Sequence, residues 1–118
     1  MSKTIFTLKK TLHYIHANAI KKIAKEEIES LDPSLLPLQQ GLTLSSYVGN
    51  TPFKAVVLNI TLEEENIKVK SGIFYTGIIA GCSCSDDPSP TDEQNEYCEL
   101  LFLINKQTAE TSVKLLED

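Results

Sequence analysis

Two stretches of this chain carry apolar side chains at consecutive positions, and they constrain its fold more than any other feature. Residues 55–58 read AVVL, and residues 100–104 read LLFLI. Successive side chains of a strand point to opposite faces of its sheet, so both segments place apolar groups on both faces. A sheet built from such strands needs a cover on each side.

Only one segment predicts a covering helix. Between Thr7 and Leu31 the apolar residues recur at intervals of three or four, at Leu8, Leu12, Ile15, Ala19, Ile20, Ile23, Ala24, Ile28 and Leu31. This spacing predicts one long amphipathic helix over about residues 7–31, with Thr7 as its N-cap. Asp32 ends the helix, because the residue before a proline avoids the helical conformation.

The rest of the chain predicts a connector over residues 32–53 and an antiparallel sheet over about residues 54–116. The fold class is therefore α+β, with the N-terminal helix packed on four to five strands. A chain of 118 residues with 42% hydrophobic residues forms a single domain, here residues 1–118. Residues 85–97 are an acidic loop within the sheet.

One helix leaves the second apolar face of the sheet without a cover. An open apolar face of that size is unusual on a monomer. We expect a second copy of the chain to cover it, since two-fold homodimers are the commonest assemblies. The alternative is a sheet that curls around a pocket for a small molecule, as in an enzyme or a carrier.

Composition excludes several classes of protein. All 11 residues of the Lys and Arg types are lysines, and the net charge is −5. Proteins that bind nucleic acids commonly use the guanidinium group of arginine to make paired hydrogen bonds to phosphate and guanine. This chain has no arginine, so the sequence indicates no nucleic acid partner. No apolar run reaches the roughly 20 residues of a membrane span, and no signal peptide is recognisable at the N-terminus. The expected location is cytoplasmic, with no membrane contact.

The acidic part of the chain suggests a ligand. Residues 85–99 carry six carboxylates and no lysine, whereas residues 1–30 carry six lysines and three glutamates. Such a region could attract a cationic or amphipathic molecule, or a protein partner. Binding is favoured over catalysis, with no catalytic residue and no cofactor singled out. The candidate ligand-binding residues are Tyr75, Tyr97, Asp86, Asp87 and Glu96.

The three cysteines, Cys82, Cys84 and Cys98, allow a second interpretation. An odd number excludes a fully paired disulfide set within one chain, so free thiols are the simplest expectation. Alternatively, the three thiols bind zinc with a fourth ligand or act in redox exchange. If two strands flank the acidic loop as a hairpin, Cys98 comes opposite Cys84. The surrounding carboxylates oppose a reactive thiolate.

Overall fold

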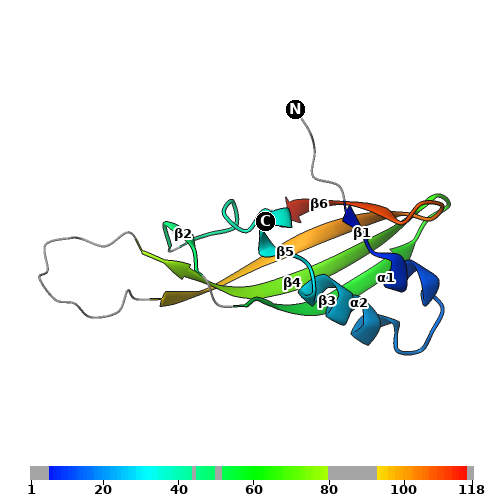
Figure 1. Cartoon of the computed structure of the whole chain (residues 1–118), viewed down its shortest axis with the longest axis horizontal. Coiled ribbons are helices and arrows are strands. Elements are labelled where there is room, and N and C mark those ends of the chain that lie inside the picture. The colour runs from blue at the N-terminus through cyan, green and yellow to red at the C-terminus, as the bar shows by residue number, and fades with distance from the viewer. Residues whose placement is uncertain (1–5, 44, 50–51, 80–92, 117–118) are drawn as a thin grey trace, which may run out of the picture.

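The computed structural model describes residues 6–43, 45–49, 52–79 and 93–116. It has an α+β fold in which short helices pack on an antiparallel sheet (Figure 1). In chain order the elements are β1 (Phe6–Thr7), α1 (Lys9–His13), α2 (Ile20–Glu29), the 3-10 helix η1 (Pro33–Leu35), β2 (Tyr47–Val48), β3 (Lys54–Leu62), β4 (Asn66–Ile78), β5 (Glu93–Asn105) and β6 (Glu110–Leu116).

The single long helix predicted over residues 7–31 is wrong. Thr7 belongs to β1, and residues 14–19 form turns between α1 and α2. A spacing of three and four residues fits two short helices lying side by side as well as one long helix, so periodicity alone cannot separate the two. Contacts between α1 and α2 explain why the chain forms two short helices here and not one long helix.

Glu27 of α2 stabilises the start of α1. Its carboxylate accepts hydrogen bonds from the backbone N–H groups of Lys10 (2.9 Å) and Thr11 (2.7 Å) and from the Thr11 hydroxyl (2.7 Å). The first N–H groups of a helix have no partner within it, so an acidic side chain from a neighbouring helix can replace the missing N-cap. One continuous helix could not bring Glu27 back to Thr11.

The sheet is antiparallel throughout, with the strand order β1-β6-β5-β4-β2 and with β3 also paired to β4. Four strands, β3 to β6, make up most of it, and the two-residue strands β1 and β2 extend its edges. The central pair, β4 and β5, remains in register from Asn66 opposite Asn105 to Ile78 opposite Glu93. The antiparallel sheet predicted from the sequence is thus confirmed.

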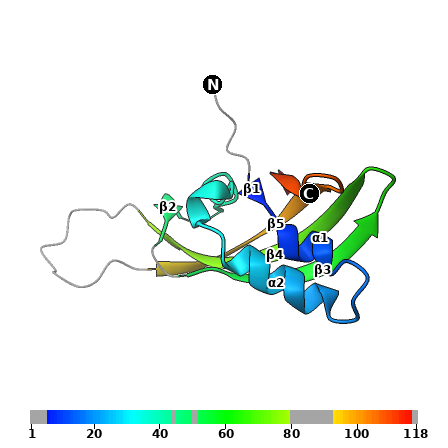
Figure 2. The same cartoon turned by 45° about the vertical axis from the view of Figure 1, so that its right-hand side comes forward.

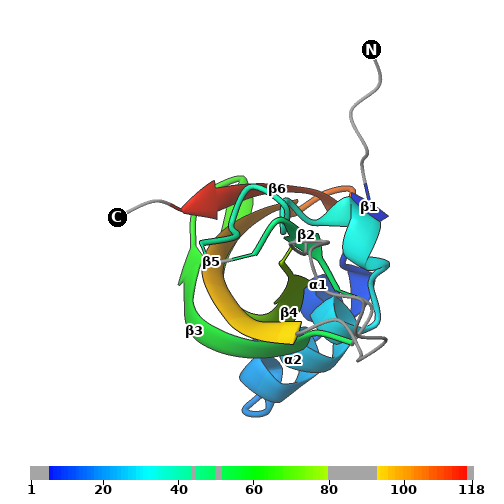
Figure 3. The ribbon, with the colours of Figure 1, turned by 90° about the vertical axis from the view of Figure 1, so that its left-hand side faces the viewer.

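The inner face of the curled sheet holds the core. Alternate residues of the central strands point inward and are buried: Ile67, Val69, Ile73 and Tyr75 from β4, and Cys98, Leu100, Phe102 and Ile104 from β5. Viewed along the long axis of the molecule, the sheet curves strongly, and the two helices and the connector lie along its open side (Figure 3). Figure 2 shows the same arrangement from an oblique side. Leu8, Ile28, Leu36 and Leu38 complete the core from that side.

The outer, convex face carries the intervening residues. Val56, Phe74 and Tyr97 are large apolar residues on this face, and they are 42%, 51% and 40% exposed. Leu101 and Leu103 of β5 also lie on the outer face and are half-buried. We call these five residues the outer patch. The strands therefore present apolar groups on both faces, and within the described residues the helices and connector lie on the inner side only.

Candidate functional site

Of the three cysteines, only Cys98 lies within the described residues, because Cys82 and Cys84 fall outside them. Cys98 is unpaired with another thiol and lies opposite Ile73 of β4. The expectation that it lies opposite Cys84 is therefore wrong. The paired strands end at Ile78 and Glu93, five residues and about 17 Å along β5 from Cys98.

Cys98 is enclosed by the connector. It is 7% exposed, and a side chain at Gly41 would lie 2.9 Å from its Cβ and 3.1 Å from its Sγ. Burial raises the pKa of the Cys98 thiol, and the neighbouring carboxylates of Glu96 and Glu99 raise it further, against a lowering effect of the Tyr75 hydroxyl. A thiol kept protonated and covered is a poor nucleophile and a poor zinc ligand. Among the described residues no group of three metal-ligating side chains is present.

The raised pKa of Cys98 predicts a loss of stability in alkaline solution. The folded state holds this proton more tightly than the unfolded chain does. Its contribution to stability is fully present below the unfolded pKa, about 8.5, and is lost as the pH rises towards the folded pKa. We expect urea unfolding to show a free energy of unfolding that falls as the pH rises above about 8.5, the ordinary pKa of a thiol.

The control is Cys98→Ala, which removes the titrating group and should reduce the slope of stability against pH. An unchanged slope in this variant would contradict the assignment. Burial also raises the pKa of the Tyr75 hydroxyl above the ordinary tyrosine value. Because this hydroxyl lowers the pKa of Cys98, Tyr75→Phe should extend the fall in stability caused by Cys98 to higher pH, and it should also remove a further fall above about pH 10.

Tyr75 and Glu96, two of the candidate ligand-binding residues, face each other across β4 and β5 on the inner side of the sheet. The Tyr75 hydroxyl donates a hydrogen bond to the backbone carbonyl of Leu38 (2.8 Å). Its ring is buried. Tyr75 therefore fixes the connector at Leu38.

Glu96 holds the next part of the connector. One carboxylate oxygen accepts from the backbone N–H and the hydroxyl of Thr43, both at 3.0 Å. The other accepts from the backbone N–H (2.9 Å) and the hydroxyl (2.7 Å) of Ser45. Glu96 is 3% exposed, and a buried carboxylate is tolerated only where hydrogen bonds replace its hydration. We call Glu96, Thr43 and Ser45 the connector latch.

Thr43 and Ser45 were missed by reasoning from the sequence. Their spacing of two residues directs both pairs of donors to one carboxylate, but nothing in a short polar segment identifies the acceptor, which lies more than 50 residues away. The arrangement has the chemistry of an anion site whose anion is supplied by the chain itself. The two remaining acidic candidates, Asp86 and Asp87, lie outside the described residues.

Tyr97 lies apart from the other candidates, on the outer face. Its ring packs against that of Phe74 with centroids 4.7 Å apart. It also covers Gly72, where an added Cβ would lie 2.8 Å from a ring carbon. The Tyr97 hydroxyl donates to Glu99 (3.0 Å), and Lys70 approaches the other oxygen of Glu99 (3.5 Å). The aromatic pair is therefore held in place while half of its surface remains in water.

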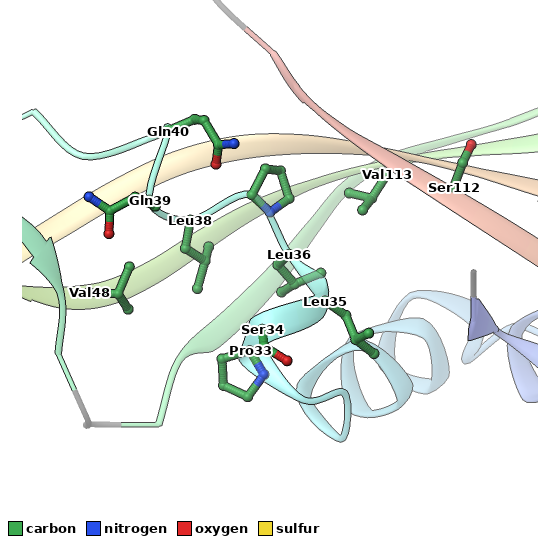
Figure 4. Close-up of a pocket in the computed structure, with 11 residues that line it drawn as sticks. Pro33, Ser34, Leu35, Leu36, Leu38, Gln39, Gln40, Val48, Ser112 and Val113 are labelled. Atoms are coloured by element: carbon green, nitrogen blue, oxygen red, sulfur yellow. The ribbon is translucent and has the colours of Figure 1, made fainter. Parts of the chain in front are cut away.

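The connector also borders a cavity of about 680 Å³ beside β6 (Figure 4). Its lining is mostly apolar, and the side chains of Leu36, Leu38, Val48 and Val113 point towards it. A second cavity of about 400 Å³ shares Pro33, Leu38 and Val48 with the first and is also lined by Phe53 and Tyr75. The first cavity is also lined by four polar residues, Ser34, Gln39, Gln40 and Ser112, so it offers apolar contact together with groups that can hydrogen-bond a ligand.

Comparison of this chain with protein families, with curated proteins and with solved structures finds no match in any of the three. In the part of the chain that the structure describes, none of the helices has the length and apolar character needed to cross a bilayer.

Proposed function

We propose that this protein acts by binding, and that it forms a homodimer through the outer patch. The observation that carries the proposal is the exposed aromatic pair, Phe74 and Tyr97, on the two middle strands of the sheet. The enclosure of Cys98 favours binding over thiol chemistry.

The composition of the outer patch supports a protein interface. Aromatic side chains contribute a disproportionate share of binding energy at the centre of interfaces, because they bury a large area and lose few rotamers. Phe74 and Tyr97 are already ordered by their mutual contact, and Tyr97 is also held by its hydrogen bond to Glu99. A partner that covers them therefore gains apolar contact at a low cost in side-chain entropy.

Curvature limits the area that two copies can bury. Two convex faces meet only along their crests, which here are formed by β4, β5 and part of a neighbouring strand. A strip three strands wide and ten residues long covers roughly 480 Å², using about 4.8 Å per strand and about 3.3 Å per residue. Two such strips bury roughly 1,000 Å², which corresponds to a weak and reversible interface. We therefore expect association in the micromolar range or weaker.

Replacing Phe74 tests this proposal. Phe74→Asp places a charge at the centre of the patch and should raise the dissociation constant of the homodimer at least about tenfold. The measurement is sedimentation velocity of the full chain from about 5 µM to about 1 mM, the range over which a weak dimer dissociates. Because Phe74 is half exposed, the variant should remain folded, which circular dichroism checks.

The matched control is Tyr14→Asp. Tyr14 is an aromatic residue of similar exposure (47%), and it lies at the end of α1, away from the outer face. This variant should associate like the wild type. A wild-type protein that stays monomeric at the highest concentration would overturn the proposal, as would equal effects of the two substitutions.

A further inference from the structure

One edge of β6 lacks a strand partner over most of its length. The short strand β1 pairs only with Glu110 and Thr111. The following residues, Ser112 to Leu116, pair with β5 on one side and, within the described residues, with no strand on the other. This free edge is about 17 Å long, at about 3.3 Å per residue. Main-chain groups along such an edge can pair with a further strand.

The hydrogen bonding of β1 identifies which groups are free. Leu8 donates its backbone N–H to the carbonyl of Ala109 (3.2 Å), and Thr111 belongs to the next bonded position on that side. Bonded positions alternate along an antiparallel strand, so Val113 and Leu115 also direct their N–H and C=O groups away from β5. No described residue bonds to these groups there. The edge therefore offers donors and acceptors to an added strand.

Two cavities separate this edge from the connector. The cavity of about 680 Å³ lies beside Ser112 and Val113, and another of about 280 Å³ lies beside Leu115 and Leu116. Gln40 of the connector lines both. Figure 4 shows Val113 pointing towards the connector across the larger cavity. We call the free edge and these two cavities the edge groove. An added strand would direct alternate side chains into the cavities, because side chains opposite each other lie on the same face of a sheet.

Lys114 selects the charge of the added strand. It lies at the middle of the free edge, opposite Leu101 of β5, and forms no ion pair within the described residues. Glu99, the nearest acidic residue of β5 in the strand register, already binds the Tyr97 hydroxyl and pairs with Lys70. A carboxylate directly opposite Lys114 in a new strand is therefore favourable, and a lysine at that position is unfavourable.

The same lysine disfavours two occupants that the protein itself could supply. If two copies paired along residues 112–116 about a two-fold axis, Lys114 of one copy would lie opposite Lys114 of the other. Continuing the register of β1 beyond Phe6 would place Lys3 opposite Lys114. Like charges directly opposite each other destabilise a strand pair. A strand from a different protein, with an acidic residue at this position, avoids both conflicts.

We propose that the edge groove binds an extended segment of another protein, antiparallel to β6, with a carboxylate opposite Lys114 and apolar residues opposite Val113 and Leu115. Main-chain hydrogen bonds to β6 provide affinity, and the two cavities receive the apolar side chains. The larger cavity, beside Val113, takes the bulkier side chain. This is a second surface in addition to the outer patch, so the inference does not depend on the homodimer.

A capped peptide of the sequence Thr-Val-Glu-Leu-Thr tests the proposal, since antiparallel pairing places its glutamate opposite Lys114 and its leucine opposite Val113. In an NMR titration of the ¹⁵N-labelled full chain, the backbone amide signals of Val113 and Leu115 should shift, with a dissociation constant of about 1 mM or below. The same peptide with lysine in place of glutamate should bind about fivefold more weakly. Lys114→Glu should reverse this preference, and an unchanged preference would contradict the role of Lys114.

Methylation of the peptide nitrogens separates strand pairing from simple filling of the cavities. The valine and leucine of the peptide each donate an N–H to β6, so methylating both nitrogens should weaken binding at least about tenfold. The N–H of the central glutamate points away from β6, and its methylation is the matched control. Equal losses from the two modifications would overturn strand addition. Phe74→Asp should bind the peptide like the wild type, which keeps this test independent of the homodimer.

Hydrogen exchange of the free protein identifies the rival occupants. Without peptide, the N–H groups of Val113 and Leu115 should exchange rapidly with solvent, because no strand protects them. Slow exchange that does not depend on protein concentration would show that residues 1–5 occupy the edge. Slow exchange that increases with concentration would assign the edge to a second copy. Either result overturns the proposal, as does the absence of a shift in the two amide signals at about 5 mM peptide.

Discussion

Glu96→Ala is expected to lower the free energy of unfolding by about 3 kcal/mol, because it leaves two backbone N–H groups and two hydroxyls of the connector without their acceptor. The loss is large because Glu96 is buried, so water cannot replace the carboxylate without opening the connector. Glu96→Gln keeps one acceptor oxygen and should lose about half as much. Chemical unfolding followed by circular dichroism measures both values.

The control for Glu96 is Glu110→Ala. Glu110 is an exposed residue of β6, and its replacement should change stability by less than about 0.5 kcal/mol. A second measurement distinguishes opening of the connector from general destabilisation. In native buffer, alkylation of Cys98 should become much faster in Glu96→Ala, because the connector that covers the thiol is released. Unchanged protection of Cys98 would show that the connector latch does not hold the connector.

Gly41→Ala should cost about 2 kcal/mol, since the new Cβ lies too close to atoms that cannot move away. It would lie 2.9 Å from the Cβ of Cys98 and 3.0 Å from the Tyr75 hydroxyl. Both neighbours are buried, and the hydroxyl of Tyr75 is bound to Leu38. The connector must therefore lift from β5, which thermal unfolding detects as a lower midpoint.

Gly72→Ala is the matched comparison for Gly41→Ala. Its Cβ would also meet atoms at short distance, 2.5 Å from the hydroxyl of Tyr97 and 2.8 Å from a ring carbon, but Tyr97 is partly exposed and its ring can turn outward. The turn gives up the ring contact with Phe74 and the exposed hydrogen bond to Glu99, so we expect a loss of stability of about 1 kcal/mol or less, smaller than at Gly41. If both variants lose the same stability, tight packing of the connector over Cys98 does not explain the cost at Gly41.

Alternation along the strands could be predicted from the sequence because it depends on local pattern alone. Lys68 and Lys70 alternate with Ile67 and Val69, and the same phase continues to Phe74 on the outer face. Glu96 has the phase of Leu100 and Phe102, so its inward position was also implied. The inward position of Glu96 was not predicted because carboxylates are almost never fully buried unless they are paired, so a glutamate in a strand is expected to face water.

The break in the helix and the position of the connector depend on contacts between distant residues. Glu27 accepts hydrogen bonds at the start of α1, and the spacing of apolar residues from Leu8 to Leu31 gives no indication of this contact. Similarly, no local pattern pairs Thr43 and Ser45 with Glu96. Hydrogen bonds between residues far apart in the chain leave no periodicity, so these parts of the fold required the structure.

The pairing of β1 with β6 has a consequence for biosynthesis. Phe6 lies opposite Thr111, so β1 cannot pair with β6 until the ribosome has synthesised residues 110 and 111. Translation adds about 5–20 residues per second, which leaves this edge of the sheet unfinished for several seconds. Leu8 is fully buried in the finished protein and donates its backbone N–H to Ala109, so it cannot complete its packing until this late part of the chain has been made.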